Sequence, residues 1–511
     1  MTQCRKQNLK KIISFVSFIC IALFIFTRVT YLFREVSCSR DIITGFEEEE
    51  NLDVIFIGSS TVVEYYQPLT AWKEYGYTSY SYGTLYGQID LYWRYMDRVL
   101  QTHEPELFVI DLRMLTTLSG DVYEQGLRFW ADSLPVFSKD RYLSVKDYLE
   151  RHTLDENANR TSYYFDIAKY HTNSSALASP DNWKYLNNKG CSKYKGYELS
   201  SVHHFFDEPD IETEEKAELS PMQSEVLYQL LDYCKEKELN VLFVICPYIL
   251  SEDEQKVYNT AKEIVTSYGY NYINANEYYD EINLDFTTDM KNINHVNCVG
   301  AEKYTKFLAE YIVQTYEIPK HRDDASYAHW NEVYETFAES LEQEKENVYQ
   351  AVERKYEAAN LSQYLSECDN IYEWYSGARN DNFTVIVNAD LQKHSFEKID
   401  AQGRHLLEQW GIDTTGSNHY LRISCGEDII FEEENTEAID YSGVMGVVDG
   451  LGQVHYKVHI DEGVSLLIGE EEYYSSDDGI YIILFDNNFK MVVDSMALYV
   501  NDDGAMEIKR M

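Results

Sequence analysis

One serine and one histidine of this chain occupy settings that suit acyl-transfer chemistry. Ser60 follows the apolar run 53–57 and Gly58, which places it at the turn after a buried strand. His295 lies in a polar, loop-like stretch just before Gly300 and an amphipathic segment. A serine becomes a nucleophile when an imidazole accepts its proton and nearby N–H groups stabilise the oxyanion. We therefore predict that Ser60 is a nucleophile and His295 its base.

The elements that must position this pair follow a β/α pattern over residues 52–318. Short apolar runs at 53–57, 107–110 and 241–245 are typical of strands buried on both faces, and a helical pattern covers 221–238. Strands that alternate with helices predict a three-layer α/β domain with a parallel sheet. Ligands of such sheets bind at the carboxyl ends of the strands, where Ser60 is expected.

Residues 122–220 interrupt this alternation. The segment is rich in Tyr, Asn, Ser and Lys, and we interpret it as an insertion at the edge of the active site. It could act as a lid or a substrate platform. Irregular packing without a role in binding is the alternative.

An apolar stretch near the N-terminus predicts a membrane anchor at residues 12–33. It is long enough to cross a bilayer, which needs about 20 residues, and Arg28 near its end can extend to the headgroups. The basic residues before it place residues 1–11 in the cytoplasm and the main domains outside the cell; they are Arg5, Lys6, Lys10 and Lys11. A cleaved signal peptide is the alternative, although no small-x-small cleavage site follows the run.

The C-terminal part is predicted to contain a helical connector and a second domain. Residues 328–370 are helical in pattern and highly charged, with a sparse apolar stripe. Residues 380–511 are β-rich, which predicts an α+β domain. Its expected strands lie at 383–387, 420–423, 454–460 and 480–485, and its expected helix at 395–410.

Composition excludes some classes of function. The chain has 44 Lys and Arg against 87 Asp and Glu, a formal net charge of −43, which argues against a nucleic-acid partner. Its nine Cys are scattered without a C-x-x-C pair, so no zinc motif is indicated. We expect no metal and no other cofactor.

Two segments together resemble the first and last conserved blocks of the SGNH/GDSL hydrolase superfamily. They are VIFIGSS at 54–60 and DFTTDMKNINHVNCVGAEKYTKFL at 285–308. The likeness is greatest to the membrane-anchored envelope branch, which includes accessory proteins of D-alanyl transfer and alginate O-acetylation. The resemblance covers about half the chain. It implies that Ser60 is the nucleophile, that the Ser60 and Gly83 N–H groups form the oxyanion hole, and that Gln88 adds a possible polar contact to substrate.

The sequence departs from this family at two places. Asn292 stands three residues before His295, where the family has Asp; its carbonyl could accept the imidazole proton, or Asp289 could replace it. The Gly-x-Asn-Asp of the third block is absent, and the corresponding strand ends in Asp111-Leu-Arg113. Arg113 could bind an anionic group of a substrate, or form a salt bridge with Asp111.

The C-terminal domain resembles another family. FTVIVNADLQKHSFEKIDAQGRHLLEQWGI at 383–412 and DDGIYIILFDNNFKMVVDSMAL at 477–498 are similar to the interleukin-like EMT-inducer domain, a module related to the PANDER fold. This resemblance implies association with carbohydrate and no catalysis.

Two functions are consistent with these patterns. The first is a single-pass cell-membrane protein, with its domains outside the cytoplasm, that acts as a serine acyl-ester hydrolase or O-acyltransferase on cell-envelope glycan. Its partners would be an envelope polysaccharide or its acyl donor, and a membrane-bound O-acyltransferase. The second is a catalytically impaired SGNH-like protein that binds glycan or serves as a scaffold, because Asn292 brings no charge to the imidazole.

Overall fold

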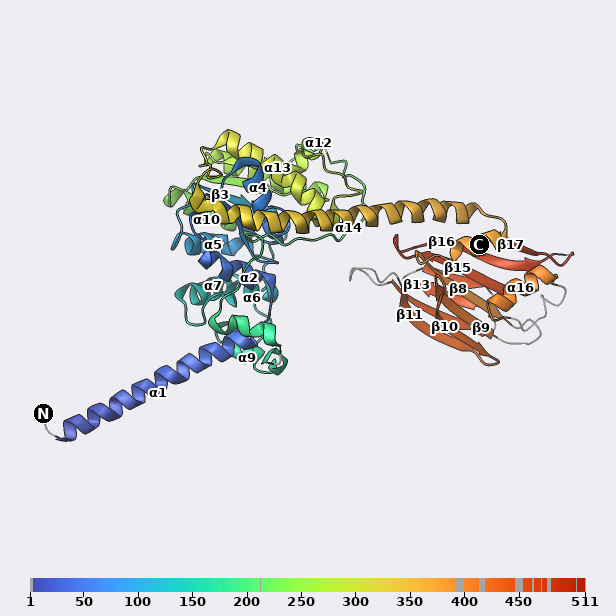
Figure 1. Ribbon diagram of the computed structural model, residues 1–511, viewed down its shortest axis with the longest axis horizontal. Helices are drawn as coiled ribbons and strands as arrows, with labels where there is room; N and C mark the ends of the chain where they lie inside the picture. The colour runs from blue at the N-terminus through green and yellow to red at the C-terminus, as the bar shows by residue number, and fades with distance from the viewer. Residues whose placement is uncertain are drawn as a thin grey trace. The chain divides into compact units, whose positions relative to one another are not determined.

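The computed structural model of this protein contains two compact units, Met1–Tyr349 and Gln350–Met511 (Figure 1). The division falls within a long helix, α14 (Ala328–Glu367), which covers the predicted connector. The described residues are 3–177, 179–211, 213–390, 399–412, 419–445, 454–461, 464–469, 471–475, 479–501 and 503–510. The first two residues of the predicted cytoplasmic tail and residues 395–398 of the predicted helix lie outside them.

The first unit is built on a five-stranded parallel sheet in the order β2-β1-β3-β4-β5. The strands are β1 (Val54–Gly58), β2 (Ser79–Gly83), β3 (Leu107–Asp111), β4 (Val241–Ile245) and β5 (Asn271–Asn274). Every residue of β1 to β4 is buried, as the continuous apolar runs of β1, β3 and β4 predict; β2, in which Ser and Tyr alternate, was not among the predicted strands. The chain leaves β1 for β2 on one side and returns to β3 on the other. The carboxyl end of β1 is therefore a topological switch point, where ligands of such sheets bind.

Helices flank this sheet in packed pairs: α4 contacts α13, and α5 contacts α10. The helices are α3 (Ser60–Val63), α4 (Pro68–Tyr75), α5 (Tyr92–Val99), α10 (Pro221–Glu236), α11 (Glu252–Ser267), α12 (Tyr279–Ile282) and α13 (Cys298–Thr315). Capping boxes begin both α10, with Ser220 and Gln223, and α11, with Ser251 and Glu254. The predicted α/β class with a parallel sheet is confirmed for this unit.

The predicted insertion is largely helical in its first part. It contains α6 (Glu124–Ala131), α7 (Lys139–Arg151), α8 (Arg160–Tyr164), α9 (Ile167–Tyr170) and the 3-10 helices η4 (Ser174–Leu177) and η5 (Pro180–Asn187). Of these elements, α9, η4 and η5 pack against the N-terminal helix α1 (Gln3–Phe33), and α6 packs against α2 (Cys38–Gly45). The later part, near residue 200, runs beside the sheet edge and the His295 loop, with Ser81 N–H bonded to Lys195 O at 3.0 Å and Cys298 N–H to Ser200 O at 2.8 Å.

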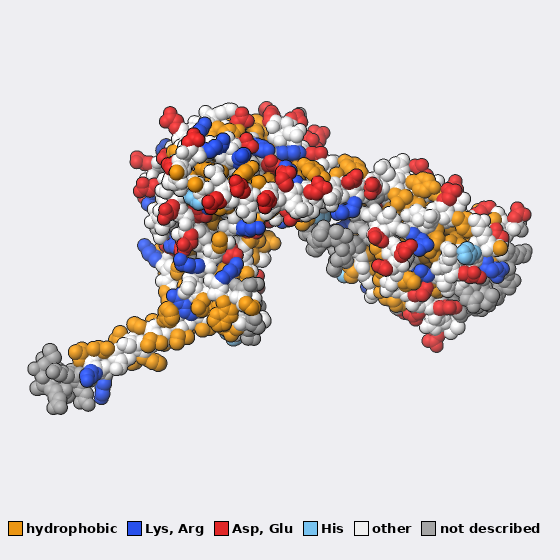
Figure 2. Space-filling model, in the orientation of Figure 1, with side chains coloured by type: hydrophobic (Ala, Val, Ile, Leu, Met, Phe, Trp, Pro, Cys, Tyr) orange, Lys and Arg blue, Asp and Glu red, His pale blue; other side chains and the backbone are white. Residues whose placement is uncertain are grey.

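Helix α1 contains one apolar stretch, Leu9–Phe33, that is long enough to cross a membrane. Figure 2 shows hydrophobic side chains along this helix. A membrane anchor and a signal sequence both have this length and composition. The predicted apolar segment at 12–33 is therefore present as a helix.

The second unit combines two antiparallel sheets. The larger has the order β10-β9-β8-β15-β16-β17, and the smaller has the order β11-β12-β13-β14. Their strands are β8 (Phe383–Asp390), β9 (His419–Cys425), β10 (Asp428–Asn435), β11 (Ile439–Met445), β12 (Val454–Ile460), β13 (Val464–Ile468), β14 (Glu471–Ser475), β15 (Gly479–Asp486), β16 (Met491–Val500) and β17 (Met506–Arg510). All four predicted strands are observed, as β8, β9, β12 and β15.

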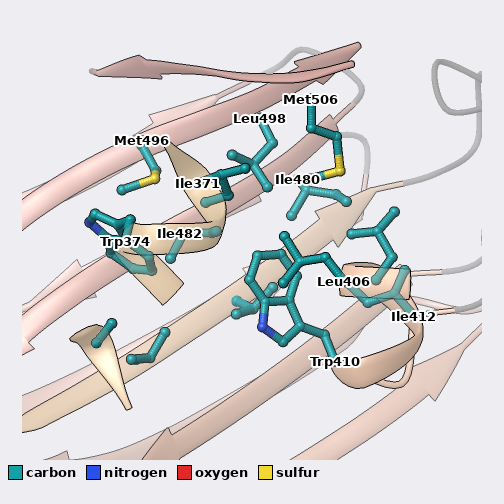
Figure 3. Packing of buried hydrophobic residues seen from close by; sticks show 14 of the residues in the cluster. Ile371, Trp374, Leu406, Trp410, Ile412, Ile480, Ile482, Met496, Leu498 and Met506 are labelled. Atoms are coloured by element: carbon teal, nitrogen blue, oxygen red, sulfur yellow. The ribbon is translucent and has the colours of Figure 1, made fainter. Parts of the chain in front are cut away.

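Both faces of the larger sheet are covered by apolar cores, and β15 contributes to both of them. Ile480, Ile482 and Leu484 of β15 join a core with α15 (Ile371–Ala378) and α16 (Ala401–Gln409). Trp374 of α15 and Trp410, directly after α16, belong to this core (Figure 3). The alternate residues of β15 join a second core with β12 and β13. Side chains of a strand point to opposite faces in turn, so one continuous apolar run serves two cores.

Candidate active site

The structure brings Ser60 and His295 into direct contact. Ser60 Oγ lies 2.7 Å from His295 Nε2, although 235 positions separate the two residues. Ser60 is the first residue of α3, directly after β1, and Ser59 caps this short helix by accepting the Thr61 N–H. His295 begins β7 (His295–Val296), which pairs with β6 (Met290–Asn292). A hydroxyl and an imidazole at this distance match the arrangement of nucleophile and base that serine enzymes use.

Asn292 is the third member of this group. The β6–β7 register places Asn292 directly opposite His295 across a two-residue turn. Its Oδ1 lies 3.1 Å from His295 Nδ1 and accepts the Asn294 N–H at 2.8 Å. The Asn294 N–H is a donor only, so the oxygen of the amide faces it, and His295 Nδ1 must carry the proton. His295 Nε2 is therefore free to accept the Ser60 proton.

The imidazole is kept neutral by its surroundings. Burial, together with the positive charges of Arg113 and Lys291, lowers the pKa of His295 to about 3. A neutral imidazole is the form that accepts a proton from serine. The same surroundings disfavour the imidazolium that forms once the proton is transferred, and among the described residues Nδ1 faces the amide of Asn292 rather than a carboxylate that would offset this.

Arg113 holds the loop that carries His295. Its guanidinium donates to Asn294 O and, at 2.7 Å, to Asn294 Oδ1, and it stacks over the Tyr248 ring at 3.7 Å. Tyr65 OH also donates to Asn294 O at 2.7 Å. The turn between Asn292 and His295 is thus fixed from two sides by side chains that belong to the sheet edge.

The predicted salt bridge between Arg113 and Asp111 is not formed. The Asp111 carboxylate instead accepts two backbone N–H groups, Arg113 N–H and Cys246 N–H, both at 2.9 Å. It is fully buried, and burial raises the pKa of Asp111 to about 6. Asp111 therefore joins the ends of β3 and β4, and the Arg113 guanidinium is bonded to a loop rather than left to bind an anion.

The predicted alternative in which Asp289 orients His295 is wrong. Asp289 Oδ2 accepts from Lys303 Nζ at 2.7 Å and from Asp285 N–H at 2.8 Å, while Asn292 occupies the position beside Nδ1. Burial raises the pKa of Asp289. Gly300 allows this arrangement, because a Cβ there would lie 2.7 Å from Asp289 O. Asp289 thus ties the loop to α13.

Two backbone groups near Ser60 suit an oxyanion. Ser60 N–H begins α3, and it has no acceptor among the described residues. Gly83 lies beside Gly58 in the sheet register, and a Cβ on Gly83 would lie 2.6 Å from Gly58 O and 3.1 Å from Ser59 O. Only glycine fits this close to the nucleophile turn, as the proposed place of Gly83 in the oxyanion hole requires.

Gln88 is engaged with the protein itself. Its Nε2 donates to Tyr86 O at 2.7 Å, and its Oε1 accepts from Tyr148 OH at 3.3 Å. Both polar ends of the amide are therefore used within the fold, where they connect the segment after β2 to α7. This corrects the prediction of a polar contact from Gln88 to substrate.

Sequence reasoning missed Asn294, Tyr65 and Tyr248, which build the support of the His295 loop. Their partners lie far away in the chain; Tyr65 and Asn294 are 229 positions apart. Asn at a two-residue turn was the only local signal. Within the described residues, no group of three or more His, Cys, Asp or Glu side chains could hold a metal ion.

The chain was compared with family models and with curated proteins. No family model and no curated protein matches the chain. The functional argument therefore depends on the site.

Replacing Arg113 tests its effect on His295. We expect Arg113→Gln to lower kcat for ester hydrolysis about ten- to a hundredfold, because the loop loses its main support. Loss of the positive charge should also raise the pKa of His295 from about 3 toward its ordinary value. A base with a higher pKa is protonated at higher pH, so the acidic limb of kcat/KM should move upward. Arg113→Lys is the matched control: it keeps the charge but lacks the forked guanidinium, so kcat should fall while the acidic limb stays in place. An unchanged profile in Arg113→Gln would contradict this role.

Proposed function

We propose that this protein is a membrane-anchored, extracytoplasmic serine acyl-ester hydrolase or O-acyltransferase that acts on cell-envelope glycan. The observation that carries the proposal is the 2.7 Å contact between Ser60 Oγ and His295 Nε2 at the carboxyl end of β1. In this mechanism Ser60 attacks the acyl carbonyl while His295 accepts the hydroxyl proton. The Ser60 and Gly83 N–H groups stabilise the tetrahedral oxyanion. His295 then returns the proton to the leaving alcohol, and the acyl group passes to water or to a sugar hydroxyl.

Several features support assignment to the SGNH type. The nucleophile stands at a strand-to-helix turn, the histidine precedes the last helix of the same unit, and a glycine of the neighbouring strand lies beside the turn. These positions agree with the sequence blocks that resemble the superfamily. The apolar helix α1, read as an anchor, would keep the site close to envelope polymers.

Exposed aromatic side chains near the nucleophile turn support a sugar substrate. Tyr86 is 47% and Tyr123 43% exposed, and their ring centroids lie 5.7 Å apart. Gly87, the residue after Tyr86, lies beside Gly58, because a Cβ on Gly87 would be 3.0 Å from Gly58 O. Aromatic faces of this kind can stack on sugar rings. The second unit resembles a carbohydrate-associated module, and we infer that it contributes binding and no catalysis.

A glycan-binding or scaffold protein without turnover is the second candidate. It is favoured by Asn292, which orients the imidazole without the charge that stabilises an imidazolium. The absence of a third-block asparagine removes one side-chain donor from the oxyanion hole.

Full-length protein in lipid nanodiscs decides between these functions. We expect it to release acetate from p-nitrophenyl acetate and from an O-acetylated oligosaccharide, with measurable acetate from both. Adding an unacetylated oligosaccharide and following its mass tests transfer, because an acetylated acceptor forms only by transfer. Retention of the oligosaccharide without release or transfer of acetate would support the binding protein and contradict the enzyme.

A further inference from the structure

The end of α1 is enclosed by the insertion. Arg28 Nη1 donates to Leu186 O, and Asn173 Nδ2 donates to Phe33 O, both at 3.1 Å. The ring of Phe26 stacks on that of Phe137, with centroids 6.2 Å apart. The helix is exposed from Leu9 to Ile25, half-buried at residues 26–28 and buried at residues 30–32. Its last turns therefore belong to the first unit. Arg28 binds a protein carbonyl there, which corrects the expectation that its side chain extends freely to the headgroups.

Large apolar side chains are exposed around this junction. Trp183 of η5 is 51% exposed and Phe137 is 58% exposed, and Trp183 Nε1 donates to Leu177 O at 3.3 Å. We call the exposed residues around the end of α1 the collar; they are Val36, Phe137, Phe165, Leu177 and Trp183. Figure 2 shows hydrophobic side chains gathered where α1 enters the unit. A contiguous exposed apolar surface of this kind marks an interaction site.

The length of the free part of α1 indicates what covers the collar. From Ile12, the first residue after the basic cluster, to Phe26 the helix rises about 21 Å at 1.5 Å per residue. The hydrocarbon core of a bilayer is about 30 Å thick, and a tilted helix spans even less. A depth of about 30 Å is reached only near Leu32, which is already surrounded by the insertion. The turn of α1 at which contact with the insertion begins, at Phe26 beside Phe137, must then lie about 9 Å below the surface of the hydrocarbon core.

The charge of the insertion permits this approach. Residues 122–200, the part of the insertion that contains α9, η4 and η5, carry eleven Lys and Arg against ten Asp and Glu. The counts are 12 against 17 for the whole insertion, 122–220, and 44 against 87 for the chain. Bilayers with anionic lipids repel acidic surfaces, and a nearly neutral segment avoids that cost. Tryptophan and other aromatic side chains are also enriched at the membrane interface, where one end of the ring system meets water.

We propose that the collar is a membrane-docking surface that enters the headgroup and upper acyl region of the bilayer that α1 spans. The apolar side chains of the collar fill the depth that the free part of α1 does not cover. The docked insertion fixes the first unit at one height and orientation above the membrane. This inference rests on the membrane anchor of the proposed function and is independent of the chemistry of Ser60.

Trp183 is a natural reporter for this docking. Of the seven tryptophans, Trp72, Trp130, Trp330, Trp374 and Trp410 are fully buried and Trp93 is half-buried. Full-length protein is placed in vesicles of phosphatidylcholine and phosphatidylglycerol, with or without bromine on the acyl chains, which quenches nearby indoles. We expect bromine to quench only the fluorescence of Trp183, which is the part of the emission that Trp183→Phe removes. The quenching should be strongest when the bromine lies near the start of the acyl chains. Trp93→Phe is the matched control and should keep the quenching.

The remaining outcomes overturn the inference in distinguishable ways. Absence of quenching in protein that remains in the vesicles would mean that the collar stays in water, and would leave the anchor and the hydrolase intact. Quenching that is lost as the protein-to-lipid ratio rises would mean that a second copy covers the collar. Protein released from the vesicles would contradict the anchor itself. Ester hydrolysis measured in the same samples tests Ser60 separately.

Discussion

Ser60→Ala is expected to lose all labelling by a fluorophosphonate probe and at least about a thousandfold of ester hydrolysis. The probe reacts only with a serine whose proton is accepted by a base, and Ser60 Oγ is the atom that contacts His295 Nε2 at 2.7 Å. His295→Ala should weaken labelling strongly, because Ser60 would keep its hydroxyl but lose the base. Labelling is measured on full-length protein in detergent or nanodiscs.

The neighbouring serine provides the matched control. Ser59 is buried, and its Oγ accepts the Thr61 N–H as the cap of α3. Ser59→Ala should therefore retain labelling, with a loss of stability of about 1 kcal/mol from the missing cap. Labelling of Ser60→Ala at the level of the unaltered protein would contradict the proposed nucleophile, and no labelling of folded unaltered protein would favour the binding function.

Asn292→Asp is expected to raise kcat/KM for ester hydrolysis about tenfold or more. Asn292 Oδ1 already receives the Nδ1 proton of His295 at 3.1 Å, so a carboxylate there keeps the tautomer and adds a negative charge. That charge stabilises the imidazolium formed in the transition state. In serine proteases, the reverse change from Asp to Asn lowers the rate about 10⁴-fold, partly because the histidine then has the wrong tautomer. The carboxylate should also raise the pKa of His295 from about 3, so the acidic limb of the rate profile moves upward.

Asn292→Ala separates orientation from charge. It removes the acceptor for both His295 Nδ1 and Asn294 N–H, so kcat should fall rather than rise. If Asn292→Asp gave an unchanged rate and an unchanged pH profile, the missing charge would not be what limits turnover. Because Asp289 is bonded to Lys303, it could not explain such a result.

The proposed docking surface bears on how the enzyme would reach its substrate. A site held at one height above the bilayer meets polymer and acyl donor only at that height, so the collar would restrict the substrate class by geometry. The site itself lies at the carboxyl end of β1, and the collar lies at the junction of α1 with η5. The two features can therefore be altered independently, which keeps the membrane and catalytic experiments separate.

Local pattern predicted several of the strands and helices of both units. Strands β1, β3 and β4 are uninterrupted apolar runs, and such runs form strands wherever both faces are buried, whatever their neighbours are. The same holds for β15 of the second unit, whereas β12 alternates buried and exposed residues, which is the pattern of a strand with one face in a core. Sequence pattern likewise predicted the turn after β1, the histidine before α13 and the apolar helix near the N-terminus, because each depends on residues adjacent in the sequence.

Only the tertiary structure determined which side chains form hydrogen bonds with one another. The sequence was compatible with a place in the site for Asp289, Arg113 and Gln88. In the structure, Asp289 bonds to Lys303, Arg113 to Asn294, and Gln88 to Tyr148. The fold also placed the insertion around α1, a contact that no periodicity encodes. A hydrogen bond has a range of about 3 Å, so its partner is set by how distant segments pack. Sequence spacing thus determined which residues could do chemistry here, and packing determined which of them meet.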